Sequence, residues 1–204
     1  TPSQALAKRG IGYVELRAVD VNPYSAIGIN EDTAGFLEVL ALYCLLQDSP
    51  DLLDVEQDLI EQNQAEVVNR GRAPNAKILE AGQELPLIAW IQQHVTAMQP
   101  LADTLNQSYA TDLYSQAMLV MQSRIDDVDE TLSAHVIADT MEQGGTWSFG
   151  SHMAKEHINL YEQHTLSAET LAYFGELAQT SLQNQQQLEQ EKDISFDEYL
   201  AKFR

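Results

Sequence analysis

The sequence is poor in basic residues and in long apolar runs. Only 11 of its 204 residues are Lys or Arg, against 31 Asp or Glu, and the formal net charge is −20. Such a surface repels nucleic acids and anionic membranes, so we expect neither as a partner. The longest apolar stretch, Phe36 to Leu46, is interrupted by Glu38 and is shorter than the roughly 20 residues that cross a bilayer. Residues 1–10 contain no apolar signal segment, and together these shortages predict a soluble protein.

Cysteine is nearly absent as well, since Cys44 is the only one in the chain. A disulfide within the chain is therefore excluded, which is typical of a reducing compartment and predicts a cytoplasmic protein. Cys44 lies in the apolar run Ala41–Leu46, and this position predicts a small buried hydrophobic residue. A catalytic thiol is the alternative.

Helical patterns dominate the chain after residue 30. Capping residues, apolar three-four spacing and terminating glycines predict helices over residues 1–9, 30–47, 54–70, 86–107, 109–125, 133–142, 148–164 and 167–190, and a last one from Ser195. Ser195 and Glu198 form a capping box, with Ile194 and Tyr199 as a hydrophobic staple. The helix from Asn30 is apolar nearly all round, so we expect it to be the most buried.

A single strand is predicted, over residues 11–19. Its odd positions carry Tyr13, Glu15 and Arg17, while its even positions carry Val14 and Leu16, as in a strand with one buried face. A lone strand is not stable, and no other segment has a matching pattern. We therefore expect most of its sheet to be absent from this chain.

Glu15 and Arg17 form the first candidate site. Two residues apart on a strand, they point the same way with about 7 Å between their Cα atoms. A carboxylate can hold Mg²⁺ and a guanidinium can bind a phosphoryl oxygen. By pattern alone, a solvated charge pair on an exposed sheet face is the commoner interpretation.

Other candidates carry weaker signals. Asp20 and Asn22 can order the loop that ends at Pro23, or touch a ligand. His152 with Glu156 and His157 with His164 share helix faces but match no metal motif. The run Gly144–Gly150 lacks the lysine of a phosphate-binding loop, which favours a connector with Trp147 or Phe149 in the core. Asn63 and Arg72 are surface residues or reach a nearby site.

One longer segment carries a family resemblance. Residues 5–29, Ala-Leu-Ala-Lys-Arg-Gly-Ile-Gly-Tyr-Val-Glu-Leu-Arg-Ala-Val-Asp-Val-Asn-Pro-Tyr-Ser-Ala-Ile-Gly-Ile, closely resemble the glutamate–cysteine ligases of the gamma-proteobacterial type. The family pattern is Glu-x-Arg, a small residue, a hydrophobic residue, Asp, a hydrophobic residue, Asn and Pro. The resemblance continues at residues 36–37 and 42–47, and at Asn63, residues 67–68 and Gly71-Arg72-x-Pro74. It thins after Pro86 but persists at residues 133–134, at residues 144–146 and in the closing helix, so it spans nearly all of the chain.

The resemblance implies an activity and its ligands. Members of this family use ATP to phosphorylate the γ-carboxylate of glutamate, and the amine of cysteine then attacks the acyl phosphate to give γ-glutamylcysteine, the first step of glutathione synthesis. By residue-for-residue likeness, Glu15 is a Mg²⁺ ligand and Arg17 contacts the transferred phosphoryl group. Tyr13, on the same strand face, is a weaker candidate for lining the nucleotide and substrate site.

The resemblance also completes the predicted architecture. Family members are longer, so this chain is expected to be their C-terminal portion and to need the N-terminal part as its partner, with ATP, L-glutamate and L-cysteine as substrates. The predicted fold is mainly α, with residues 1–29 forming a strand and loop of a catalytic sheet in a glutamine-synthetase-like α+β fold, and residues 30–204 a helical region. The rival hypothesis is a non-enzymatic helical module that adds a strand to a partner's sheet.

Overall fold

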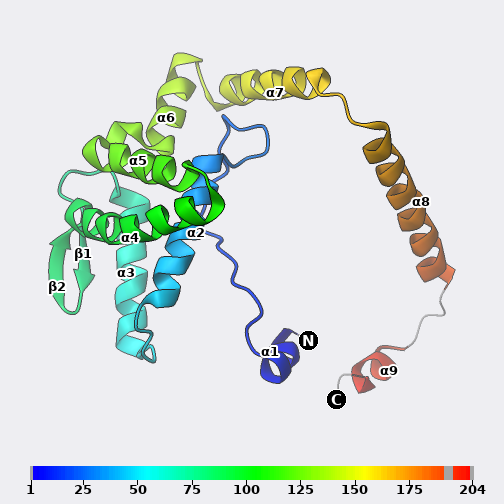
Figure 1. Ribbon diagram of the computed structural model, residues 1–204. Helices are drawn as coiled ribbons and strands as arrows, with labels where there is room; N and C mark the ends of the chain where they lie inside the picture. The colour runs from blue at the N-terminus through cyan, green and yellow to red at the C-terminus, as the bar shows by residue number, and fades with distance from the viewer. Residues whose placement is uncertain (1, 191–194, 203–204) are drawn as a thin grey trace. The chain divides into compact units, whose positions relative to one another are not determined.

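The computed structural model describes residues 2–190 and 195–202. The chain divides into two compact units, Thr1–His157 and Ile158–Arg204. In chain order the elements are α1 (Pro2–Arg9), α2 (Glu31–Leu46), α3 (Asp54–Arg70), β1 (Lys77–Glu80), β2 (Gln83–Pro86), α4 (Leu87–Tyr109), α5 (Leu113–Asp126), the short 3-10 helix η1 (Val128–Glu130), α6 (Leu132–Glu142), α7 (Thr146–Gln163), α8 (Ala168–Gln190) and α9 (Phe196–Ala201). Figure 1 shows them, and no described helix is long and apolar enough to cross a membrane.

The core of the first unit lies where α2, α4 and α5 pack against one another (Figure 1). Its buried side chains come from all three helices: Val39, Val95, Met98, Ala102, Leu105, Tyr114 and Met118. The helices α2 and α5 approach closely at Gly35, where a Cβ atom would lie 3.3 Å from Cγ of Leu113. A larger residue there would push the two helices apart.

Capping chemistry explains where several helices begin. The side chain of Asn30 accepts a hydrogen bond from the backbone N–H of Thr33, 3.1 Å away, and so starts α2 as predicted. In the second unit, Ser195 and Glu198 form the predicted capping box of α9. The predicted contact of Tyr199 with Ile194 involves a residue outside the described ranges.

The most buried helix is α4, and the expectation that α2 would be so is wrong. Five residues of α4 are buried, against Gly35 and Val39 in α2. The C-terminal end of α2 is uncovered within this chain, with Leu45 and Leu46 76% and 66% exposed. Cys44 lies on this end and is exposed, so its predicted burial is also wrong. A hydrophobic pattern shows which residues avoid water, but not which neighbour covers them.

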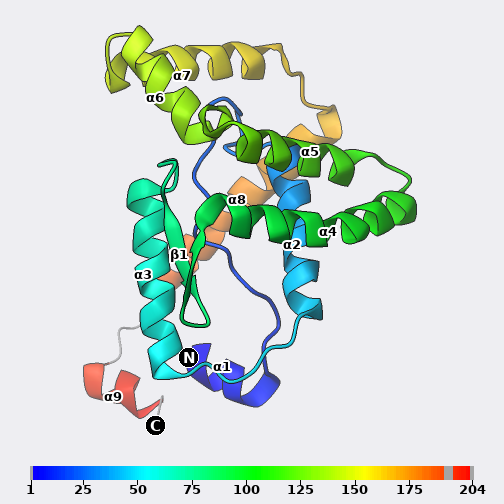
Figure 2. The same cartoon turned by 90° about the vertical axis from the view of Figure 1, so that its left-hand side faces the viewer.

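A small antiparallel hairpin, β1–β2, was not predicted from the sequence. It pairs Lys77 with Pro86 and Glu80 with Gln83 around the two-residue turn Ala81–Gly82, whose φ angles are 49° and 78°. Positive φ at both central residues is the turn geometry that suits a tight hairpin, and Gly82 adopts it without strain. Figure 2 shows the hairpin beside α3.

The predicted strand over residues 11–19 has no regular secondary structure in this chain. Residues 10–22 form neither helix nor strand, and both predicted faces are exposed, with Tyr13 84% and Val14 76% accessible. The physical reason is that a strand is stabilised by backbone hydrogen bonds to a neighbouring strand, and the described part of this chain offers no such neighbour to residues 11–19. That this segment pairs with a sheet supplied by other parts of a longer protein stays a prediction.

Candidate functional site

Glu15 and Arg17 lie side by side, although the strand from which their spacing predicted this is not formed. Nε of Arg17 is 3.0 Å from Oε1 of Glu15, and Nη2 of Arg17 donates a hydrogen bond to Oε2 of Glu15 at 3.0 Å. The guanidinium therefore contacts both oxygens of the carboxylate. The side chains are 82% and 59% exposed respectively. An exposed ion pair of this kind contributes little to stability. Either group can therefore leave the other and bind a ligand at little cost.

The loop after this segment ties it to the helical body. The backbone N–H of Asn22 donates to the carbonyl of Gly28 at 2.8 Å, and the Ser25 hydroxyl donates to the carbonyl of Ile29 at 2.7 Å. The Tyr24 hydroxyl donates to Oδ2 of Asp139 in α6 at 2.5 Å, and the Tyr24 ring meets Phe149 edge-on, 5.9 Å between centroids. Glu15 and Arg17 are therefore exposed, whereas the loop that follows them is held to the helices by hydrogen bonds and by the contact of Tyr24 with Phe149.

The bond between Tyr24 and Asp139 changes the acidity of the phenol. Partial burial and then the adjacent carboxylate raise the pKa of Tyr24 from 10.0 to about 12. Tyr24 consequently remains a protonated donor into the alkaline range, above pH 10, and it joins the loop to α6 across 115 positions of sequence.

The described residues offer no complete protein cage for a metal ion. Nowhere in them do three His, Cys, Asp or Glu side chains gather in a way that could hold one. The two candidate pairs from the sequence are not part of such a group. They are His152 with Glu156 and His157 with His164. Glu15 offers a single exposed carboxylate, which is enough for a shared Mg²⁺ site but not for a metal centre built from this chain alone.

Other residues singled out from the sequence have structural contacts. Asn63 bonds the backbone of Leu79, accepting from its N–H and donating to its carbonyl, each at 2.7 Å. Arg72 lies 3.5 Å from Asp129. In the predicted connector, Phe149 is buried while Trp147 is 88% exposed, so Phe149 is the residue that reaches the core.

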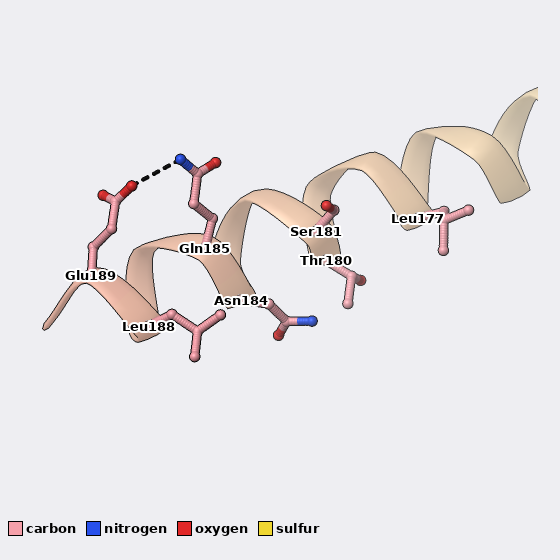
Figure 3. Close-up of a pocket in the computed structure, with 7 residues that line it drawn as sticks. All are labelled: Leu177, Thr180, Ser181, Asn184, Gln185, Leu188 and Glu189. Carbon is pink, nitrogen blue, oxygen red and sulfur yellow. Dashed lines mark hydrogen bonds between the residues drawn. The ribbon is translucent and has the colours of Figure 1, made fainter. Parts of the chain in front are cut away.

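One surface depression lies on α8 and has no arrangement of catalytic groups. Figure 3 shows its residues, all from this one helix: Leu177, Thr180, Ser181, Asn184, Gln185, Leu188 and Glu189. The carboxylate of Glu189 accepts a hydrogen bond from Gln185 at 2.8 Å (Figure 3). We therefore interpret this feature as the uneven surface of a helix.

A smaller pocket brings in a residue that the sequence did not indicate. Its volume is about 160 Å³, and it is lined by Val19, Asp20, Asn22, Gly28, Ile29, Thr33, Arg124 and Leu132. Asp20 and Asn22 were candidates for touching a ligand. Arg124 was not, because a single arginine near the end of a helix has no pattern that marks it.

The fold is similar to the crystal structure of the glutamate–cysteine ligase from Francisella tularensis in complex with AMP, with a TM-score of 0.88, 26% identity, and coverage of 99% of this chain and 40% of that chain. The family model for glutamate–cysteine ligase matches residues 1–67. Glutamate–cysteine ligases from Pseudomonas aeruginosa strain LESB58 and Shewanella halifaxensis are 33% and 35% identical over 100% and 99% of this chain.

These matches confirm the resemblance predicted from residues 5–29 and extend it over the whole chain. The chain is similar to glutamate–cysteine ligases over its whole length, and it spans about 38% of the length of the first of these curated relatives. The matched residues of this chain, 1–67, include Tyr13, Glu15 and Arg17.

Proposed function

We propose that this chain is part of an ATP-dependent glutamate–cysteine ligase, which joins the γ-carboxylate of glutamate to the amine of cysteine through an acyl phosphate. The names of its relatives support this, as does the AMP bound to the similar Francisella tularensis enzyme. The observation that carries the proposal is the exposed Glu15–Arg17 pair within the segment that matches the family model. Its substrates would be ATP, L-glutamate and L-cysteine, and its compartment the cytoplasm.

Arg17 would contact the transferred phosphoryl group. Its guanidinium is planar, permanently charged and accessible, and it contacts both oxygens of the Glu15 carboxylate. A phosphoryl group in transfer carries charge on several oxygens, so a fixed cation beside it lowers the barrier more than it strengthens ground-state binding. Tyr13, two positions before Glu15, would line the same site.

Glu15 would supply one ligand to Mg²⁺. Mg²⁺ is commonly held by one or two carboxylates together with substrate phosphates and water, so one exposed carboxylate fits this role once Arg17 has turned to the nucleotide. The bound ion would neutralise phosphate charge. The remaining ligands, and the sheet in which residues 11–19 would form a strand, would come from the N-terminal part of the same enzyme.

The first test is Arg17→Ala in the full-length enzyme. We expect kcat to fall about 100-fold, because an interaction made mainly in the transition state is lost. The KM for ATP should change far less. Arg70→Ala is the matched control, because Arg70 pairs with Glu66 on the surface of α3 and should affect neither constant. A rise in KM with unchanged kcat would refute the phosphoryl-transfer role.

The second test is Glu15→Gln, which keeps the shape of the side chain and removes its charge. We expect the activity of the full-length variant to require a higher Mg²⁺ concentration, because a neutral amide binds the ion more weakly than a carboxylate. Glu84→Gln, at a surface residue paired with Lys77, is the control. If the Mg²⁺ titrations of Glu15→Gln and the parent enzyme coincide, Glu15 is not a metal ligand.

A further inference from the structure

The pocket that contains Arg124 and Asp20 carries an inference independent of the ligase proposal. Its lining includes neither Glu15 nor Arg17. It lies between the loop after the Glu15–Arg17 segment, the first turn of α2, the end of α5 and the start of α6. At about 160 Å³ it admits only a molecule of a few non-hydrogen atoms, well below the size of a drug-like ligand site.

Arg124 is a partly desolvated cation that has no carboxylate within ion-pair distance among the described residues. Its Nε atom is buried and has no hydrogen-bond partner, and the guanidinium forms no ion pair with any carboxylate in the described part of the chain. Its one polar contact there is Nη1 to Sδ of Met121 at 3.8 Å. Burial lowers the pKa of Arg124, and Asp32 acts in the opposite direction. With 31 acidic residues in the chain, an unpaired guanidinium is not explained by a shortage of carboxylates.

Asp20 brings the opposite charge to the same pocket. It is exposed, and among the residues described by the structure it is in no ion pair within 4.0 Å, with Arg124 or with any other cation. A small pocket thus contains one positive and one negative group that do not satisfy each other. Thr33, in the first turn of α2, and Asn22 add neutral polar groups to the lining.

We propose that this pocket binds a small zwitterionic α-amino acid, with its carboxylate on Arg124 and its ammonium group on Asp20. A guanidinium binds a carboxylate at two points. A simple anion would be repelled by Asp20 and a simple cation by Arg124. A ligand with both charges and no net charge matches both groups, and the volume restricts it to the smallest amino acids.

The experiment is calorimetric titration of the full-length protein with glycine, acetate and methylammonium as probes. Glycine has both charges, whereas each of the other two has one. We expect glycine to bind at least about tenfold more tightly than either, a difference of about 1.4 kcal/mol. Arg124→Gln and Asp20→Asn should each weaken glycine binding by a similar factor, whereas Arg124→Lys should weaken it less.

Two controls separate this site from others. Arg17→Ala alters the proposed ligase site and should leave glycine binding unchanged, while Arg70→Gln tests for a general effect of losing an arginine. Because Asp20 is exposed, Asp20→Asn should fold even if Arg124→Gln does not. Equal binding of acetate and glycine would overturn the proposal. So would glycine binding that survives Asp20→Asn, glycine binding lost in Arg17→Ala, or no binding of glycine.

Discussion

At the scale of single residues, two tyrosines join distant segments of the first unit by donating to carboxylates. Tyr24 donates to Asp139 at 2.5 Å, and Tyr114 donates to Oε2 of Glu38 at 2.8 Å. Each bond requires a protonated phenol, because a phenolate would face a negative charge. The bond to Glu38 and then burial raise the pKa of Tyr114 to about 12, the same value as for Tyr24.

These shifts predict a loss of stability at alkaline pH. Both pKa values lie above the usual 10.0, so the stabilisation is complete below pH 10 and is lost as pH rises through 12. Urea unfolding between pH 8 and pH 11.5 should show a falling free energy of unfolding. In the Tyr24→Phe/Tyr114→Phe double variant the value at pH 8 should be lower and the decline shallower. Equal slopes for the two proteins would contradict this origin.

At the scale of elements, Asn63 holds the hairpin to α3. Its side chain imitates a neighbouring strand, accepting from the N–H and donating to the carbonyl of Leu79, each at 2.7 Å. Ile78, the residue before, is buried with Ala76 and Leu87 in a second small core. A polar side chain thus compensates for a sheet that has only two strands.

Replacing Asn63 should therefore destabilise the chain more than replacing a surface asparagine. We expect Asn63→Ala to lower the free energy of unfolding by about 2 kcal/mol, because two partly buried backbone groups lose their partner. Asn69→Ala is the control: Asn69 is exposed, bonds only the carbonyl of Ala65 in its own helix, and should change stability by less than about 0.5 kcal/mol. Chemical denaturation of both variants provides the measurement. Equal effects would show that the Leu79 bonds contribute little.

The sequence predicted the elements that carry their own local signals. Asn30 caps α2, the three-four spacing of Val95, Met98, Ala102 and Leu105 gave α4 its buried face, and Ser195 caps α9. The hairpin escaped prediction because its strands have four residues each and its turn uses Ala81, a residue that disfavours positive φ. Short strands are decided by tertiary contacts, here with Asn63, which no local pattern encodes.

The candidate site was predictable only in part, because local sequence patterns do not report contacts between distant segments. The two-residue spacing of Glu15 and Arg17 on a strand predicted that they lie together. Their side chains do make contact, but on a segment without regular secondary structure, so the predicted strand geometry is not what brings them together here. Arg124 and Asp20 line one pocket because α5 lies beside the loop that follows residue 19, and no spacing in the sequence indicates that proximity. The roles of Tyr13, Glu15 and Arg17 stay predictions.

At the scale of the whole molecule, few basic groups are available to hold a nucleotide. The chain has 11 Lys and Arg residues, and Arg70, Arg72 and Lys77 each pair with an acidic side chain. A surface with net charge −20 also repels a free polyphosphate. Binding of ATP near Arg17 would therefore depend on Mg²⁺ and on cations from outside this chain.

The isolated 204-residue chain should accordingly be inactive as a ligase. It spans about 38% of its Pseudomonas aeruginosa relative, offers Glu15 as a single candidate carboxylate, and forms no described cluster that could hold a metal ion. Purified chain with ATP, Mg²⁺, L-glutamate and L-cysteine should give no γ-glutamylcysteine by mass spectrometry, whereas the full-length enzyme under the same conditions should. Product from the isolated chain that disappears in Arg17→Ala would show that these 204 residues contain a complete active site. The idea that the sheet and the remaining ligands must come from elsewhere would then be wrong.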